Sequence, residues 1–147
     1  MRIQMEKDDW YKDRILWRAK QNDLFSGRCI KFSDLPNDYI SIIEGTITEA
    51  FNPVIVFWGN QDTWTVLGTQ AIFSFYDGKL NSFKLDKIDK RVSVAQPNGI
   101  SSENIKTKSN FILLERPEML IWAPEGKELF GLMNILLMFP LKIKDIA

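Results

Sequence analysis

The chain has 147 residues, of which 45% are hydrophobic and 26% charged, and its 19 basic and 19 acidic side chains leave a formal charge of zero. This length and composition predict one globular domain whose core buries roughly two-thirds of the unfolded surface. The charge balance excludes a strong overall field that would attract nucleic acid or an anionic membrane, although a local basic patch stays open. We expect no nucleic-acid partner.

The start of the chain leads straight into charged sequence, and no apolar run approaches the roughly 20 residues that span a bilayer. We therefore expect no signal peptide, no integral membrane association and a cytoplasmic location. Cys29 is the single cysteine, which excludes an internal disulfide and a multi-cysteine metal site. A buried structural thiol is its expected role.

The first predicted element is a helix over residues 8–20, where Asp8 or Asp9 can accept from the free amides of the first turn. Trp10 and Trp17 are seven residues apart and share a face of this helix. We expect them to clamp the helix onto the body of the domain. A detachable arm that recognises a partner is the alternative.

Residues 24–52 carry a weaker pattern. The segment 24–32 alternates loosely enough for a strand bent at Gly27. Residues 37–44 fit a short helix capped by the segment before them, but 39–43 also fits an edge strand, and the periodicity does not separate the two.

A mainly β region is predicted over residues 53–122. Pro53 opens the apolar strand 54–58, and after a turn at 59–62 the next strand is expected to run on to Tyr76, with a bulge or bend at Gly68. The Asp77-Gly78 pair predicts a two-residue type I′ turn, because Gly supplies positive φ without strain. The return strand ends at residue 85.

Three further strands are predicted, at 92–94, 110–114 and 119–122. The continuous apolar run of 110–114 is typical of a central strand. A turn is expected at 96–99, and residues 101–109 fit either a mobile loop or the exposed start of the next strand.

A C-terminal helix is predicted over residues 124–139, with Pro124 in its first turn. The apolar stripe follows the i, i+3, i+4, i+7, i+8 pattern at Leu129, Leu132, Met133, Leu136 and Leu137. Further apolar residues fall outside this stripe: Phe130, Ile135, Met138 and Phe139. They indicate either deeper burial with cover from the first helix, or a subunit interface that would make the chain a homo-oligomer.

Part of this pattern resembles a known family. Two strands around Gly78 carry Leu67, Thr69, Ile72, Leu85, Asp86 and Ile88, further short strands follow, and Leu129 to Phe139 form one amphipathic helix. This order, over about residues 53–140, resembles a bacterial pleckstrin-homology-like (PH-like) domain. The resemblance implies an α+β fold, with a strongly bent antiparallel sheet or barrel closed by the C-terminal helix. The helix at 8–20 is an addition to that form. Such domains are binding platforms more often than enzymes.

Catalytic chemistry has little support in the sequence. The chain contains no histidine, which removes the commonest general base, the usual zinc ligand and the Ser-His-Asp triad. Its glycines match neither dinucleotide nor Walker spacing. The carboxylate pairs Glu115/Glu118 and Glu125/Glu128 could serve a glycosidase or a divalent cation. They also fit a turn and an electropositive helix start, so solvated or capping roles are expected. We expect no enzyme, no cofactor and no metal.

Two constellations are candidate binding sites. Trp58, Asn60, Asp62 and Trp64 place two aromatic residues beside the polar tip of a hairpin, as in partner anchors, unless one or both tryptophans face the core. The basic set Lys84, Lys87, Lys90 and Arg91 could hold a phosphate or an anionic headgroup. Asp86 and Asp89 are interleaved with it and would leave a charge-balanced edge. Lys87 and Arg91 are the residues on which headgroup binding would depend.

These observations predict a non-catalytic domain that binds another protein. An immunity-type protein that neutralises a toxin, or a regulatory protein, is a concrete version of this hypothesis. The runner-up is a PH-like module for lipid or phosphate headgroups, and a carboxylate-based enzyme comes third.

Overall fold

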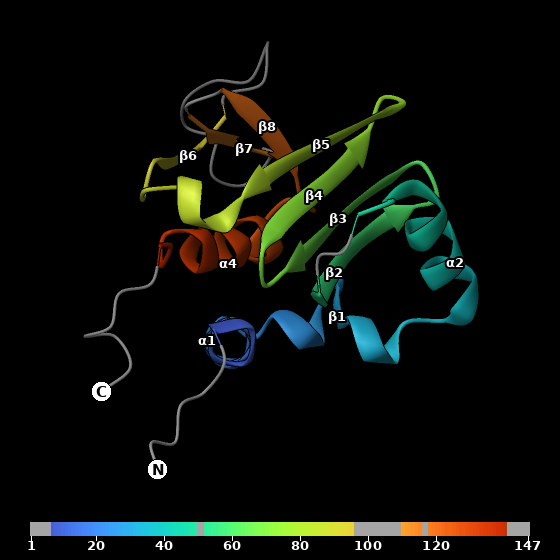
Figure 1. Ribbon diagram of the computed structural model, residues 1–147, viewed down its shortest axis with the longest axis horizontal. Coiled ribbons are helices and arrows are strands. Elements are labelled where there is room, and N and C mark those ends of the chain that lie inside the picture. The colour runs from blue at the N-terminus through green and yellow to red at the C-terminus, as the bar shows by residue number, and fades with distance from the viewer. Residues whose placement is uncertain (1–6, 50–51, 96–109, 116–117, 141–147) are drawn as a thin grey trace.

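The structure is a computed structural model that describes residues 7–49, 52–95, 110–115 and 118–140. It is an α+β fold, as expected, with a five-stranded antiparallel sheet in the order β1-β2-β3-β4-β5 and a three-stranded antiparallel sheet in the order β6-β7-β8 (Figure 1). The two sheets do not join into a closed barrel within these ranges. The turn predicted at 96–99 and the segment 101–109 lie outside the described residues.

The helices are α1 (Lys7–Gln21), α2 (Asn37–Thr46) and α4 (Lys127–Leu136), with the short 3-10 helices η1 (Leu24–Ser26), η2 (Phe32–Asp34) and η3 (Leu85–Lys87). The strands of the larger sheet are β1 (Cys29–Lys31), β2 (Pro53–Asn60), β3 (Thr63–Gly68), β4 (Ala71–Tyr76) and β5 (Lys79–Lys84). Those of the smaller sheet are β6 (Val92–Val94), β7 (Phe111–Leu114) and β8 (Met119–Trp122). Strand β7 is central in its sheet, as predicted.

The β4–β5 hairpin has the predicted turn, since Asp77 and Gly78 both adopt positive φ, at 51° and 73°. The strand before it differs from the prediction. The chain does not run straight to Tyr76 but reverses after Gly68, so that β3 and β4 pair antiparallel and Leu67 lies opposite Ile72. The reversal is held by backbone bonds from Thr69 N–H to the Asn52 carbonyl and from Leu85 N–H to the Gln70 carbonyl.

The structure resolves the ambiguity between residues 24 and 46. A 3-10 turn, η1, and the short strand β1 replace the expected bent strand, and β1 pairs with β2 at the edge of the sheet. Residues 37–46 form the helix α2 rather than an edge strand. Ile43 and the following Ile47 are buried against the sheet, so the helical spacing gives α2 its apolar contact.

The larger sheet is buried on both faces, and each face has its own cluster. On one side, α2 and its flanks cover Val56, Trp64, Val66 and Phe73. On the other side lie α1, α4 and the three-stranded sheet (Figure 1). Strands β2, β3 and β4 therefore carry apolar residues at successive positions, as strands buried on both faces do.

The contact made by α1 differs from the expected tryptophan clamp. Its buried stripe is Tyr11, Ile15 and Ala19, which are four residues apart and so share one face. Trp10 is half-buried against this stripe, whereas Trp17 is 41% exposed. The helix is held by Tyr11 instead, whose ring meets Phe139 edge-on at 5.0 Å between centroids.

Helix α4 begins later than predicted. The chain first bends at Gly126, whose φ of 92° suits glycine, and the helix starts at Lys127 rather than at Pro124. Two of the additional apolar residues are covered within the chain, because Ile135 and Phe139 are fully buried and α1 packs against α4, as the deeper-packing alternative expects. Phe130 and Met138 are half-buried.

A buried polar network joins the two sheets. The Trp122 amide donates to Ser74 Oγ at 2.9 Å, and Thr65 Oγ1 donates to the Trp122 carbonyl at 2.5 Å. The two hydroxyl groups lie 2.8 Å apart, and Tyr76 OH donates to the Leu120 carbonyl at 2.9 Å. Side chains of β3 and β4 therefore satisfy backbone groups on the outer edge of β8, with which none of the described strands pairs.

Candidate functional site

The hairpin between β2 and β3 carries the first predicted site. Trp58 and Trp64 lie opposite each other in the register, both on the side of α2. Trp64 is fully buried and stacks on Phe75 at 5.4 Å between centroids, so it belongs to the core. Trp58 is half-buried and stacks on Tyr39 of α2 at 4.0 Å. Of the two tryptophans, Trp64 faces the core, which is the alternative role that the sequence allows.

The polar tip of this hairpin is at the surface. Asn60 and Asp62 are both exposed, and Asn60 Oδ1 accepts from the Asp62 amide at 2.7 Å. This contact shapes the turn. Of the four residues proposed from the sequence, Trp58, Asn60 and Asp62 therefore have accessible surface. Trp64 is buried in the core opposite Trp58.

The predicted basic set is divided between two places. Lys84 and Lys87 line a cleft of about 730 Å³ beside the β3–β4 turn. Lys90 lines a different cleft, and its Nζ donates to the Leu137 carbonyl at 3.1 Å. Arg91 pairs with Asp89 at 3.5 Å. Lys87 and Arg91 thus do not converge on one ligand.

The cleft around Lys84 and Lys87 is electrostatically mixed. Its lining carries three lysines and three carboxylates: Lys7, Lys84, Lys87, Asp8, Glu49 and Asp86. Asp86 is ion-paired with Lys7 and accepts from Tyr11 OH at 2.6 Å. Burial alone would raise the pKa of Asp86, but the bonds from Lys7 and Tyr11 outweigh it and lower that pKa. The six formal charges of this lining cancel, so the cleft has no net charge with which to hold a small anion, although Lys84 and Lys87 form no ion pair within the described residues.

Strand β5 is an edge of the larger sheet, and no strand in the described part of the chain pairs with its outer side. In a two-residue hairpin the pair Tyr76 and Lys79 exchanges backbone bonds, and such pairs alternate along the strands. The backbone N–H and C=O groups of Leu80, Ser82 and Lys84 consequently point away from β4. They offer a row of groups to which an extended chain can bind.

Leu80 adds an apolar anchor to this edge. It is 37% exposed, one of the large hydrophobic side chains with the most accessible surface in the described part of the chain. The sequence prediction did not single it out. The alternation that places Leu80, Ser82 and Lys84 on one face of β5 could have found it, because an apolar residue between polar ones on an edge strand is unexpected.

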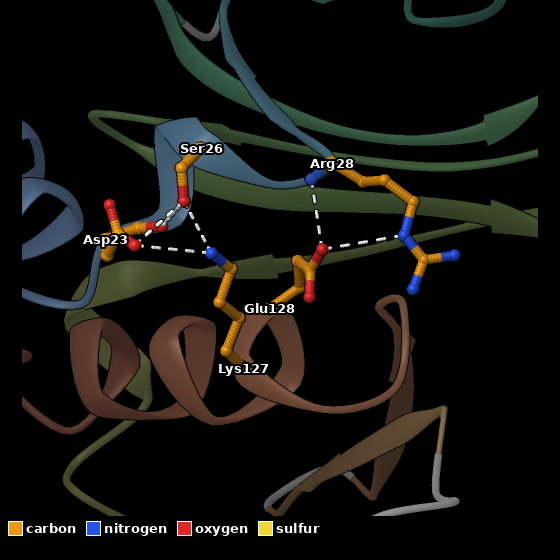
Figure 2. Close-up of polar contacts among 5 residues, drawn as sticks. All are labelled: Asp23, Ser26, Arg28, Lys127 and Glu128. Atoms are coloured by element: carbon orange, nitrogen blue, oxygen red, sulfur yellow. Dashed lines mark hydrogen bonds and ion pairs between the residues drawn. The ribbon is translucent and has the colours of Figure 1, made fainter.

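The carboxylates considered for catalysis do not assemble. Glu115 and Glu118 are exposed, and Glu128 is occupied by Arg28, whose amide donates to Glu128 Oε2 at 3.0 Å (Figure 2). Burial would raise the pKa of Glu128, but the Arg28 amide, its own backbone and the Arg28 charge together lower it. No group of three or more metal-ligating side chains occurs among the residues that the structure describes.

Cys29 is a buried free thiol, as its lone position in the sequence indicated. Burial, and then the nearby charge of Glu128, raise the pKa of the thiol far above its usual value. The thiolate that nucleophilic chemistry needs is therefore disfavoured at this position.

No protein family model, curated protein or solved structure matches the chain. In the described ranges, no helix has the length and apolar character needed to cross a bilayer.

Proposed function

We propose that this chain is a non-catalytic protein-binding domain that takes an extended, acidic segment of its partner along the outer edge of β5. The observation that carries the proposal is this edge, with outward-facing backbone groups and the exposed Leu80 beside them. Backbone pairing supplies affinity in such complexes, and side chains at alternate positions supply specificity.

The charges around β5 favour an acidic segment. Lys79, Lys84 and Lys87 are exposed and form no ion pair within the described residues. Asp86 is already paired with Lys7, so it offsets these lysines only weakly. Glutamate or aspartate side chains on an added strand would meet unpaired ammonium groups, which raises the association rate and selects the register.

The proposal also includes a fold relation and a biological role. Two antiparallel meanders followed by one amphipathic helix support a PH-like relation over residues 53–140, although the sheets stay open in the described ranges. An immunity-type or regulatory protein fits this binding mode, since an added strand can cover part of its partner without any chemistry.

A photo-crosslinker placed at residue 80 tests the proposal. In native lysate we expect the labelled protein to crosslink to one partner through an extended acidic segment, identified by mass spectrometry. Ser82→Pro removes only an outward-facing donor and should abolish the crosslink. Lys84→Glu/Lys87→Glu should do the same, because the new charges repel the acidic segment.

The matched control is Lys12→Glu/Lys20→Glu, which makes the same charge change on exposed positions of α1. This variant should crosslink like the wild type, and circular dichroism checks that every variant is folded. A partner that is retained by both β5 variants would contradict the proposed surface. Failure of the folded wild type to bind any protein would contradict the proposed function.

A further inference from the structure

We propose that a second site, in the cleft between α1 and the C-terminal end of α4, binds the phosphate group of a small ester or a lipid. This cleft has a volume of about 380 Å³. Its lining includes Arg14, Trp17 and Arg18 from α1, Lys90 from the segment before β6, and Asn134 and Met138 from α4 and its end. The site is independent of the protein-binding edge at β5.

The charge of this cleft distinguishes it from the larger one. Three cationic side chains line it, and no carboxylate is among its lining residues. The larger cleft has three carboxylates beside its three lysines. Where cations converge and no carboxylate is in the lining, the local potential favours an anion even in a chain with no net charge. The α1–α4 cleft is thus the better anion site of the two.

The guanidinium groups are positioned by an aromatic ring. The Arg14 Cζ lies 4.7 Å from the centre of the Trp17 ring, and the Arg18 Cζ lies 5.9 Å from it. These residues are spaced i, i+3 and i+4 along α1, so they share a surface of the helix. Cation–π contact limits the orientations of both side chains, which reduces the entropy that a ligand must remove.

Arg18 also has unused hydrogen-bonding capacity. Its Nη1 donates to Gln21 at 3.1 Å, whereas its Nε is buried and has no acceptor in the part of the chain that the structure describes. A buried donor without an acceptor costs free energy. Phosphate oxygens are well matched to arginine donors because they accept two parallel bonds from one guanidinium.

Two neighbouring negative groups are already compensated. Asp13 pairs with Arg14 at 3.0 Å but is not part of the cleft lining. The C-terminal end of α4 carries partial negative charge, and Lys90 donates to it through the Leu137 carbonyl at 3.1 Å. Arg18 therefore keeps the greatest capacity for a ligand, with Arg14 and Lys90 contributing charge.

The ring and its surroundings indicate what the rest of the ligand is like. Trp17 is 41% exposed, and Met138 lies in the same lining as a half-buried apolar side chain. A flat or apolar group attached to the phosphate can pack on them. A phosphate ester should accordingly bind more tightly than inorganic phosphate.

The first test is an NMR titration of the whole protein with phenyl phosphate and with inorganic phosphate. We expect both to shift the Trp17 indole signal, which Trp17→Phe identifies, and phenyl phosphate to bind more tightly. Arg14→Gln/Arg18→Gln should raise the Kd for phenyl phosphate about tenfold or more, since charge-assisted bonds are lost. If the double variant does not fold, the single variants Arg14→Gln and Lys90→Gln replace it, and each should raise the Kd for phenyl phosphate.

The control is Lys84→Gln/Lys87→Gln, which removes the same charge from the larger cleft and should leave the Kd unchanged. Cosedimentation with vesicles of phosphatidylcholine, with and without phosphatidic acid, then identifies the source of the phosphate. Binding to phosphatidic acid that Arg14→Gln/Arg18→Gln abolishes assigns a lipid, and binding of phenyl phosphate without vesicle binding assigns a soluble ester. No binding in either assay, or equal weakening by the control, would overturn the proposal.

Discussion

Glu128 shows how one charged residue holds distant parts of the chain together. Only 6% of its surface is exposed, and it accepts from the Arg28 amide, which is 100 positions away. Beside it, Lys127 contacts Asp23 and Ser26, so the start of α4 is tied to the η1–β1 segment (Figure 2). Glu128, which the sequence offers as a candidate catalytic carboxylate, thus accepts a hydrogen bond that stabilises the fold.

We expect Glu128→Ala to lower the free energy of unfolding by about 1–3 kcal/mol, because the Arg28 amide loses its acceptor. Urea denaturation at neutral pH measures this change. The exposed Glu125 gives the control: Glu125→Ala should change stability by no more than about 0.5 kcal/mol. Equal effects of the two variants would show that the buried bond contributes nothing.

The same carboxylate should make stability depend on pH. Glu128 and Asp86 have lowered pKa values in the folded state, so their contribution is complete above the unfolded pKa of about 4 and is lost as the pH falls through the folded pKa. Urea denaturation at stepped acidic pH should show Glu128→Gln/Asp86→Asn losing less stability than the wild type. Glu128 should contribute more of this pH-dependent stability than Asp86, because the Asp86 side chain is 48% exposed and its ion pair is screened by solvent.

At the scale of an element, replacing two glycines by alanine should have opposite effects on stability. Gly78 has φ of 73° in the β4–β5 turn, whereas a Cβ on Gly45, inside α2, would meet nothing within 4 Å. Gly78→Ala should destabilise by roughly 1–2 kcal/mol through backbone strain. Gly45→Ala should stabilise by roughly 0.5–1 kcal/mol through helix propensity. Thermal unfolding of both variants measures these changes: a higher Tm for Gly78→Ala would contradict the assigned turn, and a lower Tm for Gly45→Ala would contradict the expected gain in α2.

Local patterns accounted for most of the elements. The Asp77-Gly78 turn and the stripe of α4 depend on neighbouring residues, so the sequence was enough to predict them. The reversal after Gly68 was missed because a bulge in one long strand and a tight hairpin shift the alternation in the same way: with either of them at Gly68, Leu67 and Ile72 face the same cluster.

The candidate sites were harder to predict for a different reason. The basic residues from Lys84 to Arg91 are close together in the sequence, but Lys87 and Lys90 line different clefts. The cleft at Lys90 is completed by Arg14 and Arg18, which are more than 70 positions earlier. Only tertiary packing brings such residues together.

At the scale of the molecule, the network around Ser74 joins the two sheets. Ser74→Ala leaves the Trp122 amide without its acceptor and should lower the free energy of unfolding by about 1–3 kcal/mol. Hydrogen exchange should show faster exchange at the Trp122 amide than in the wild type. Ser82→Ala, on the exposed face of β5, is the control and should change neither the free energy of unfolding nor the exchange rate. Similar effects of the two variants would contradict the role of the Ser74 network in joining the sheets.

The hydrogen bonds on the outer edge of β8 also limit how copies of this chain could assemble. Growth of a fibre by strand pairing needs two usable edges per molecule, one for each neighbour. Side chains of β3 and β4 bond to the outer edge of β8, and the edge strands β1 and β6 have three residues each, so β5 is the long open edge among the described strands. Two copies that met through β5 would form a closed two-fold pair with no long edge remaining. As far as the described strands are concerned, pairing through β5 should therefore stop at two copies.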